Sequence, residues 1–411
     1  MEEWKEYKLS ELGAIIGGAT PSTKDSNNYD GEISWITPKD LSNYNNRYIF
    51  RGERMITRKG YDSCSCKMLP QGSVLFSSRA PIGYVAIAGN ELCTNQGFKS
   101  IVPDNTKVNS MFVYYLLIYN KNKIEGMGTG TTFKEVSGSV MRNVAVKVPS
   151  LPTQQKIANI LSSLDDKIEV NRRINEQLEE LAQALFKSWF VDFEPFKDGE
   201  FVESELGMIP EGWKIVDLKE FCIEIVRGYT PKYAEFSDYP ILNQKVNKGD
   251  KLEKQYYKYN KNDDSVPLNK MAQRGDVYLN SLGQGTLGRI HLYKDELSNV
   301  IVDQFITILR TDSFIKSAYL ASILKSPIYQ NEIESRITGS TGMWVLTINN
   351  IRNIKIVQPL NSLWQQLENI IEPIYRQIAI NEKENEHLTN LRDTLLPKLM
   401  SGEIDVNEVE I

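Results

Sequence analysis

The sequence is poor in the residues on which metal sites and acid–base catalysis most often depend. Its 411 residues include only four cysteines and two histidines. His291 and His387 are far apart, and only Cys64 and Cys66 lie close together, so the paired ligand spacing of a zinc site is missing. Four cysteines in so long a chain also cannot form a disulfide framework. We therefore expect reduced thiols and no metal ion held by this chain.

Long apolar stretches are absent as well. The longest one, residues 111–119, is far shorter than the roughly 20 residues that a membrane-spanning helix needs. The first residues are charged and include no apolar core of a secretory signal, so we expect a cytoplasmic protein. The hydrophobic fraction of 41% is ordinary for a globular protein, and the length predicts two or more domains.

The chain as a whole also lacks the basic excess that marks many nucleic-acid-binding proteins. Its formal net charge is −5. Counted by segment, residues 1–150 carry +4 and residues 206–359 carry +3, whereas residues 151–205 and 360–411 carry −6 each. The acidity is therefore confined to two segments, and the total does not exclude DNA as a ligand of the other two.

Sequence motifs of nucleotide-dependent enzymes are missing or fail in context. Gly283, Gly285 and Gly288 match GxGxxG, but an alternating, strand-like segment follows where a dinucleotide fingerprint needs a helix. No GxxxxGK[ST] P-loop occurs, and neither Asn-Pro-Pro nor Asp-Pro-Pro precedes an aromatic residue, as expected in an amino-methyltransferase. We therefore expect no catalytic residues in this chain.

The sequence does contain an internal repeat with a period of about 210 residues. Each half is a mixed segment, with short β-like runs, Gly and Pro turns and one helix, followed by a helical segment. This predicts an α+β fold with four regions: residues 1–150, 151–205, 206–359 and 360–411. Corresponding positions include Trp4 and Trp213, Thr20-Pro21 and Thr230-Pro231, Lys39 and Lys245, Asn95-Gln96 and Asp303-Gln304, and Pro149 and Pro359.

Each helical segment contains a heptad seam that is apolar except near its centre. The first seam runs from Ile157 to Trp189 and includes Asn171 and Asn175, and a shift of 210 residues gives Asn381 and Asn385 in the second. The two helices could pack separately on their own domains or pair with each other. A polar seam residue costs stability unless a partner satisfies it, which favours pairing with the asparagines setting the register.

The spacing alone leaves the direction of pairing open. An antiparallel pair places Asn171 opposite Asn385 and Asn175 opposite Asn381, whereas a parallel pair matches Asn171 with Asn381. Pro373 lies inside the second seam, where we expect a kink or a restart of the helix.

Several segments closely resemble the specificity (S) subunits of type I restriction–modification systems. Residues 181–195 read LAQALFKSWFVDFEP, like the segment after the central helix of that family. Similar matches are PSLPTQQKI at 149–157, GMIPEGW at 207–213 and LLPKLMSGEI at 395–404. The resemblance covers essentially the whole chain, including its two-domain, two-helix repeat.

This resemblance implies two target-recognition domains, each reading one half of a split, asymmetric DNA site. It implies that the two helices form an antiparallel coiled coil that spaces these domains. Two methyltransferase (M) subunits would dock on the helical regions, and restriction (R) subunits would join for cleavage. Catalysis, S-adenosylmethionine, ATP and Mg²⁺ would belong to the partners, which would also complete the hold on DNA. The rival classes are a stand-alone DNA-binding regulator, a coiled-coil scaffold, and a methyltransferase with its own cofactor site.

Residues that read bases should lie in the polar Gly-, Ser- and Thr-rich loops, because Arg suits guanine and Asn or Gln suits adenine. Some of them could instead have structural roles, for example Asn95-Gln96 in closing a turn or Trp344 in the core. In the first domain the DNA-binding candidates are Lys39, Arg79, Asn95, Gln96, Thr131, Thr132 and Lys134. In the second they are Gln244, Lys245, Asn280, Gln284, Arg289, Ser340, Thr341 and Trp344.

Four aromatic residues end the first helical segment. They are Phe186, Trp189, Phe190 and Phe193. Packing of the helix end into a core and docking of the M subunit remain equal alternatives, since aromatic anchors are common in both settings.

Overall fold

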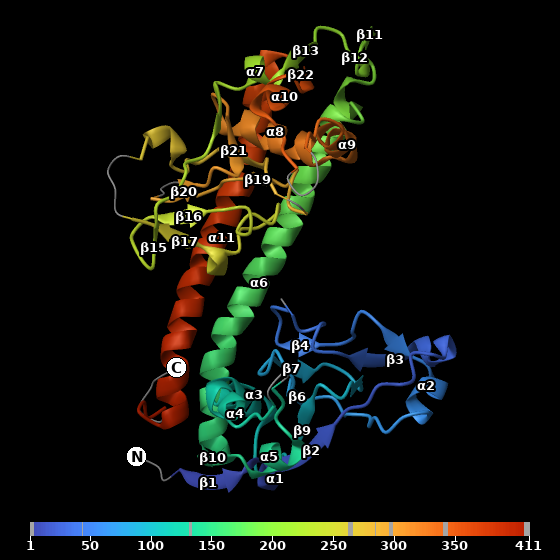
Figure 1. The fold of residues 1–411 in the computed structure, drawn as a ribbon, viewed down its shortest axis with the longest axis vertical. Coiled ribbons are helices and arrows are strands. Elements are labelled where there is room, and N and C mark those ends of the chain that lie inside the picture. Colours follow the sequence, from blue (N-terminus) through green and yellow to red (C-terminus); the bar gives the residue numbers. More distant parts are fainter. Residues whose placement is uncertain are drawn as a thin grey trace. The chain divides into compact units, whose positions relative to one another are not determined.

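The computed structural model describes residues 4–42, 44–130, 134–261, 266–283, 285–295, 299–339 and 344–406. The chain divides into two compact units. Unit 1 is Met1–Asn171 with Glu384–Ile411, and unit 2 is Arg172–Lys383. Two long helices, α6 (Leu151–Phe190) and α11 (Asn361–Ser401), contribute to both units (green and red in Figure 1). The boundaries of the four regions expected from the sequence stay a prediction.

The described residues of unit 1 form three small sheets. Their strand orders are β2-β9-β6-β7-β4, β5-β3-β8 and β1-β10. The strands are β1 (Lys5–Lys8), β2 (Gly13–Gly17), β3 (Tyr29–Ile36), β4 (Tyr48–Ile49), β5 (Met55–Ile56), β6 (Val74–Phe76), β7 (Val85–Ala88), β8 (Cys93–Thr94), β9 (Lys99–Pro103) and β10 (Ala145–Val148). Its shorter helices are α1 (Leu9–Leu12), η1 (Ser26–Asn28), α2 (Arg58–Asp62), α3 (Ser110–Tyr119), α4 (Lys121–Gly126) and α5 (Gly138–Asn143).

Unit 2 repeats this arrangement. Its sheets have the orders β14-β21-β18-β19, β15-β17-β16-β20, β13-β22 and β11-β12. The strands are β11 (Phe201–Ser204), β12 (Gly207–Pro210), β13 (Lys214–Asp217), β14 (Glu224–Arg227), β15 (Tyr233–Ala234), β16 (Pro240–Leu242), β17 (Lys258–Asn260), β18 (Val277–Asn280), β19 (Ile290–Leu292), β20 (Ile301–Val302), β21 (Ile306–Arg310) and β22 (Lys355–Gln358). The shorter helices are η2 (Glu194–Phe196), α7 (Leu218–Phe221), η3 (Lys254–Tyr256), η4 (Leu268–Lys270), α8 (Phe314–Lys325), α9 (Pro327–Ser335) and α10 (Ile348–Arg352).

The strand order confirms the internal repeat and the α+β class. The run β2-β9-β6-β7 corresponds to β14-β21-β18-β19, and β1-β10 corresponds to β13-β22. One parallel pair also recurs, because β3 pairs with β8 through Ile36 and Thr94, and β16 pairs with β20 through Leu242 and Val302. Even a helix cap is repeated: the side chain of Ser137 accepts from the N–H of Val140 at α5, as Thr347 accepts from Asn350 at α10.

Each unit buries its part of the two long helices in its own core. In unit 1, Ile157 and Leu161 of α6 and Leu399 of α11 pack with buried residues of α3 and the five-stranded sheet. In unit 2, Ile371 and Ile378 of α11 pack against α8 and the sheet that contains β18. Many of the apolar heptad positions predicted from the sequence are therefore core positions, which stabilises the amphipathic helices.

The helices pair with each other in antiparallel fashion. Within unit 1 the amide of Asn171 donates to the side-chain oxygen of Asn385 at 3.1 Å. Within unit 2 the amide of Asn381 donates to the side-chain oxygen of Asn175 at 2.7 Å. These are the opposing pairs expected for an antiparallel coiled coil. Helix α11 continues as one helix through Pro373, so of the two expectations the restart is excluded, whereas a kink at this position stays a prediction.

Two absences concern the described part of the chain only. No helix there combines the length and the apolar character required to cross a bilayer. Within the same ranges, no group of three or more His, Cys, Asp or Glu side chains has the arrangement of a metal site.

Candidate nucleic-acid interface

Four loops of unit 1 come together at one edge of its sheets, at residues 17–21, 77–83, 94–98 and 129–136, of which 131–133 are not described. The first and third meet because Gly18 has no side chain: a Cβ there would lie 2.1 Å from the carbonyl oxygen of Thr94. The N–H of Ala19 accordingly donates to that oxygen at 3.0 Å. The hydroxyl of Thr20 donates to the side-chain oxygen of Gln96, which ties the two loops together at the surface.

Unit 2 builds the same junction from its own residues. A Cβ on Gly228 would lie 2.2 Å from the carbonyl oxygen of Asp303, and the N–H of Tyr229 donates to Val302 at 2.7 Å. The hydroxyl of Thr230 donates to the side-chain oxygen of Gln304 at 2.8 Å. In each unit, therefore, the threonine of the repeated Thr-Pro motif and the repeated glutamine join two neighbouring loops.

The remaining two loops are joined to this junction by backbone hydrogen bonds in both units. In unit 1 the N–H of Ser78 donates to Gly97 at 2.7 Å, and the N–H of Val136 donates to Ser78 at 2.8 Å. In unit 2 the N–H of Ser281 donates to Phe305 at 3.0 Å, and that of Leu346 donates to Ser281 at 2.9 Å. We call the four joined loops of unit 1 the loop cluster of unit 1. The corresponding loops of unit 2, around Gly228, Ser281, Gln304 and Leu346, are the loop cluster of unit 2. The two loop clusters carry different side chains on the same backbone frame.

The DNA-binding candidates of unit 1 occupy or border its loop cluster. Lys39 is exposed and forms a 2.6 Å ion pair with Glu53. Arg79 pairs with Glu135 at 3.0 Å. The side chain of Asn95 accepts from the N–H of Gly97, so Asn95 closes a turn while Gln96 is held by Thr20. Lys134 lies half-buried beside Gly128, and Thr131 and Thr132 lie outside the described residues.

The candidates of unit 2 are distributed similarly. Gln244 accepts from the hydroxyl of Thr286 at 3.4 Å, and Lys245 is exposed. Arg289 donates to the carbonyl oxygens of Asn247 and Gly285, each at 3.3 Å. Trp344 is 46% exposed, so it is not a core residue. Gln284, Ser340 and Thr341 lie outside the described residues.

Asn280 was predicted from the sequence to bind DNA, but its position in the structure does not fit that role. It is fully buried, its side-chain oxygen accepts from the amide of Asn247 at 3.0 Å, and its own amide donates to the carbonyl oxygen of Gln244 at 3.4 Å. These bonds satisfy a polar group inside the unit, as burial requires. Asn280 therefore supports the loop of Gln244 and is not placed to meet a base.

Sequence reasoning missed the acidic member of the unit 1 cluster. Glu135 binds Arg79 and also Lys99, whose Nζ lies 3.6 Å from the carboxylate. Lys99 follows the Asn95-Gln96 turn by only a few residues, but the spacing to Glu135 gave no hint of contact. Thr20 and Gln304 were visible in the repeat, yet only the fold shows that each belongs to a Thr–Gln pair.

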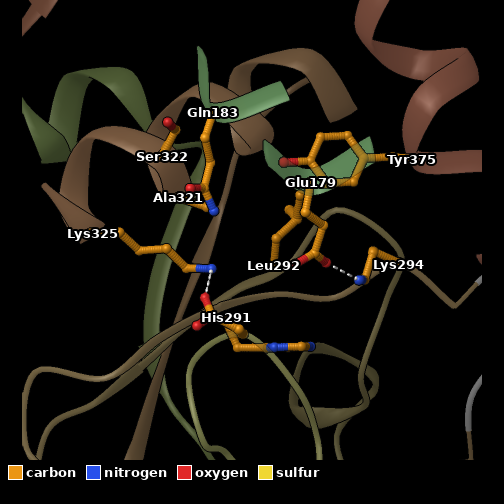
Figure 2. Close-up of a pocket in the computed structure, with 10 residues that line it drawn as sticks. Glu179, Gln183, His291, Leu292, Lys294, Ala321, Ser322, Lys325 and Tyr375 are labelled. Atoms are coloured by element: carbon orange, nitrogen blue, oxygen red, sulfur yellow. Dashed lines mark hydrogen bonds and ion pairs between the residues drawn. The ribbon is translucent and has the colours of Figure 1, made fainter. Parts of the chain in front are cut away.

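A buried cation links the α+β part of unit 2 to its long helices. Nζ of Lys294 lies 2.9 Å from a carboxylate oxygen of Glu179 of α6 (Figure 2). It also lies 3.2 Å from a carboxylate oxygen of Glu382 of α11. Burial alone would lower the pKa of Lys294, but the two carboxylates outweigh it and raise that pKa. Nearby, Nδ1 of His291 donates to the carbonyl oxygen of Gly249 at 2.8 Å. Burial and the charge of Lys294 lower the pKa of His291 to about 3.

In unit 1 the corresponding ion pairs at the long helices are formed by arginines. The buried guanidinium of Arg47 binds Asp166 and Glu169 of α6. Arg392 of α11 pairs with Asp165 at 2.8 Å, and the hydroxyl of Tyr115 donates to Asp165 at 2.6 Å. Such buried pairs are costly to break by removal of one partner, so they hold the α+β part of each unit on its own segments of the long helices.

The aromatic residues that end α6 pack into unit 2. Phe186 and Phe190 are buried. The ring centroid of Phe190 lies 4.6 Å from that of Tyr319 and 6.3 Å from that of Trp364. Core packing therefore describes these two residues. Trp189 and Phe193 are only partly buried against the same core, and a docking role for them stays a prediction.

Comparisons with known proteins agree with this architecture. Residues 1–180 match the family described as "Type I restriction modification DNA specificity domain". The chain is 36% identical to the type I restriction enzyme MjaIX specificity subunit of Methanocaldococcus jannaschii, over 99% of this chain and 95% of the relative. It is 24% identical to the type I restriction enzyme HindI specificity subunit of Haemophilus influenzae, over 98% and 100%. Among solved structures, a type I restriction-modification S subunit from M. genitalium has the same fold, with a TM-score of 0.61 and 17% identity over 97% of this chain and 96% of that one.

Proposed function

The chain belongs to the type I restriction enzyme specificity subunits, and we propose that it reads a bipartite, asymmetric DNA site with one loop cluster for each half-site. The observation that carries this proposal is the repeated frame with different side chains. Arg79 and Glu135 occupy one cluster, where Leu282 and Val345 stand in the other. Two frames with equal geometry but different chemistry suit two half-sites of different sequence.

The mildly basic charge of the segments that contain the clusters supports phosphate contact without strong non-specific affinity. Affinity for any DNA rises with the number of phosphates that the protein neutralises. Net charges of +4 and +3 can neutralise only a few phosphates. Phosphate contacts position a protein, and base contacts provide the sequence information. The isolated chain should therefore bind DNA weakly and depend on its partners for a tight complex.

The long helices offer repeated surfaces for two methyltransferase (M) subunits. Val170 and Leu181 of α6 are 47% and 49% exposed, and their repeat partners Ile380 and Leu391 of α11 are 59% and 40% exposed. Exposed apolar side chains at matching repeat positions suit two copies of one partner. Restriction (R) subunits would join this core, and S-adenosylmethionine, ATP and Mg²⁺ would serve the partner subunits, with this chain non-catalytic.

The test is to express the full chain with and without a methyltransferase subunit from its own genome and to sequence the methylated positions in the host DNA. A single asymmetric motif with an unread gap, seen only when both proteins are present, is the expected result. Methylation without this chain, or a continuous motif, would count against the proposal. Tight site-specific binding by the isolated chain at physiological salt would instead indicate a stand-alone regulator.

A further inference from the structure

Two cations in the unit 1 loop cluster share one carboxylate. Nε of Arg79 lies 3.0 Å from one oxygen of Glu135, and Nζ of Lys99 lies 3.6 Å from the other. Lys99 also donates to the hydroxyl of Ser78 at 3.4 Å. An acidic side chain at a surface that is to meet phosphates is unfavourable for binding, so its presence needs an explanation.

Folding does not supply that explanation. The backbone of Glu135 closes its loop on Thr129 through hydrogen bonds of 3.0 and 2.9 Å, and these need no carboxylate. Unit 2 provides the comparison, because Val345 forms the same backbone pair with Thr338 at 2.9 and 2.8 Å. The loop therefore closes equally well around an apolar residue.

All three charged positions are replaced together in unit 2. Arg79 faces Glu135 across a backbone bridge, and the corresponding bridge joins Leu282 and Val345. The strand position of Lys99, beside Ser78, is taken by Thr307, whose hydroxyl lies 2.5 Å from that of Ser281. None of the three charged residues of unit 1 has a charged counterpart at the corresponding position of unit 2, which suits a common role for the three.

Resting on the proposed function, we propose that Glu135 is a specificity-determining residue for the half-site read by unit 1. Its carboxylate holds Arg79 and Lys99 away from phosphates of any sequence. A guanine can displace it from Arg79, because a bidentate contact to O6 and N7 is stronger than a solvent-exposed ion pair. Glu135 thus lowers non-specific binding more than specific binding.

The first test measures binding of the full chain to a 30-base-pair mixed-sequence duplex across a range of salt concentrations. Glu135→Gln should raise the association constant about fivefold near physiological salt. It should also make the slope of log association constant against log salt concentration more negative by about 0.9, the contribution of one additional phosphate contact. Asp104→Asn is the matched control, since it frees Lys107 in the same unit but away from the loop cluster. Equal effects of the two variants, or weaker binding by Glu135→Gln, would overturn the proposal. If Glu135→Gln does not fold, Glu135→Val supplies the residue that unit 2 carries.

The second test uses the complex with the methyltransferase subunit. Glu135→Gln should reduce the ratio of methylation at the correct site to that at sites altered in one half only, with the other half read as before. An unchanged ratio contradicts the assignment. If the wild-type complex methylates no bipartite site, the proposed function fails, whereas the duplex titration still decides the role of Glu135.

Discussion

The amide of Asn171 donates a 3.1 Å hydrogen bond to the side-chain oxygen of Asn385 on the antiparallel helix. Asn171 is almost fully buried, so its polarity must be satisfied there. A buried polar pair in a seam lowers stability relative to an apolar pair but disfavours other registers. The pair therefore supports a role of the asparagines in fixing which parts of α6 and α11 meet.

Replacing Asn171, Asn175, Asn381 and Asn385 together with Leu should raise the free energy of unfolding by about 2 kcal/mol or more, because two apolar side chains become buried and two become partly buried. The single change Asn171→Leu should lower it by about 1–3 kcal/mol, because the oxygen of Asn385 loses its donor. Denaturant titration of the full chain measures both. If the fourfold variant is as stable as wild type, the four asparagines do not lie in the seam between α6 and α11.

Lys294→Met should destabilise unit 2 by about 3 kcal/mol, the lower end for breaking a buried ion pair, because Glu179 and Glu382 are partly exposed. The triple variant Lys294→Met, Glu179→Gln, Glu382→Gln should recover much of that loss, since no charge is then left unpaired. The midpoints of urea unfolding compare the three proteins. A triple variant as unstable as the single one would mean that packing by the lysine stem, and not charge, holds this contact.

His291 predicts a pH dependence with a definite sign. Its pKa of about 3 in the folded chain lies below the ordinary value of 6.5, so the unfolded chain binds a proton that the folded chain excludes. Stability from this group is complete above pH 6.5 and falls as the pH drops toward 3, by up to about 1.4 kcal/mol per pH unit. Relative to wild type, His291→Gln should lose less stability between pH 7 and pH 5. Parallel losses in denaturant titrations would contradict this.

The exposed apolar positions of the helices predict a separable defect in assembly. Leu181→Glu with Leu391→Glu should leave the melting temperature within a few degrees of wild type, since both side chains already face solvent. The same variant should lose co-purification of the methyltransferase subunit. Val202→Glu, at an exposed apolar position of β11, is the control that should retain it. Retention by both variants would move the docking surface elsewhere.

Repetition explains what the sequence could predict. The period of about 210 residues located the two mixed segments, the two helices and the opposing asparagines, since the regular spacing of buried residues is written in the sequence. The resemblance to a known family then gave the antiparallel direction. A restart at Pro373 was one of two local expectations, and the helix does not restart there, where Ile371 and Ile374 on either side are buried in the core of unit 2.

Contacts between distant residues could not be predicted in the same way. Asn280 looks like a polar loop residue, yet it ends a fully buried strand. Glu135 meets Lys99 and Arg79 only because two loops converge on the start of β9. Lys294 meets Glu179 and Glu382, which lie near the two ends of unit 2 in the sequence. Such partners depend on tertiary packing, which single-sequence patterns do not encode.

The central claim is that each loop cluster reads its own half-site. Methylome sequencing of hosts that express the full chain with its methyltransferase subunit tests this most directly when wild type is compared with Arg79→Ala and Gln284→Ala. Each variant should relax the methylated motif in one half, a different half for each, and leave the gap length unchanged. Identical motifs from all three proteins, or the loss of both halves together in either variant, would contradict the account.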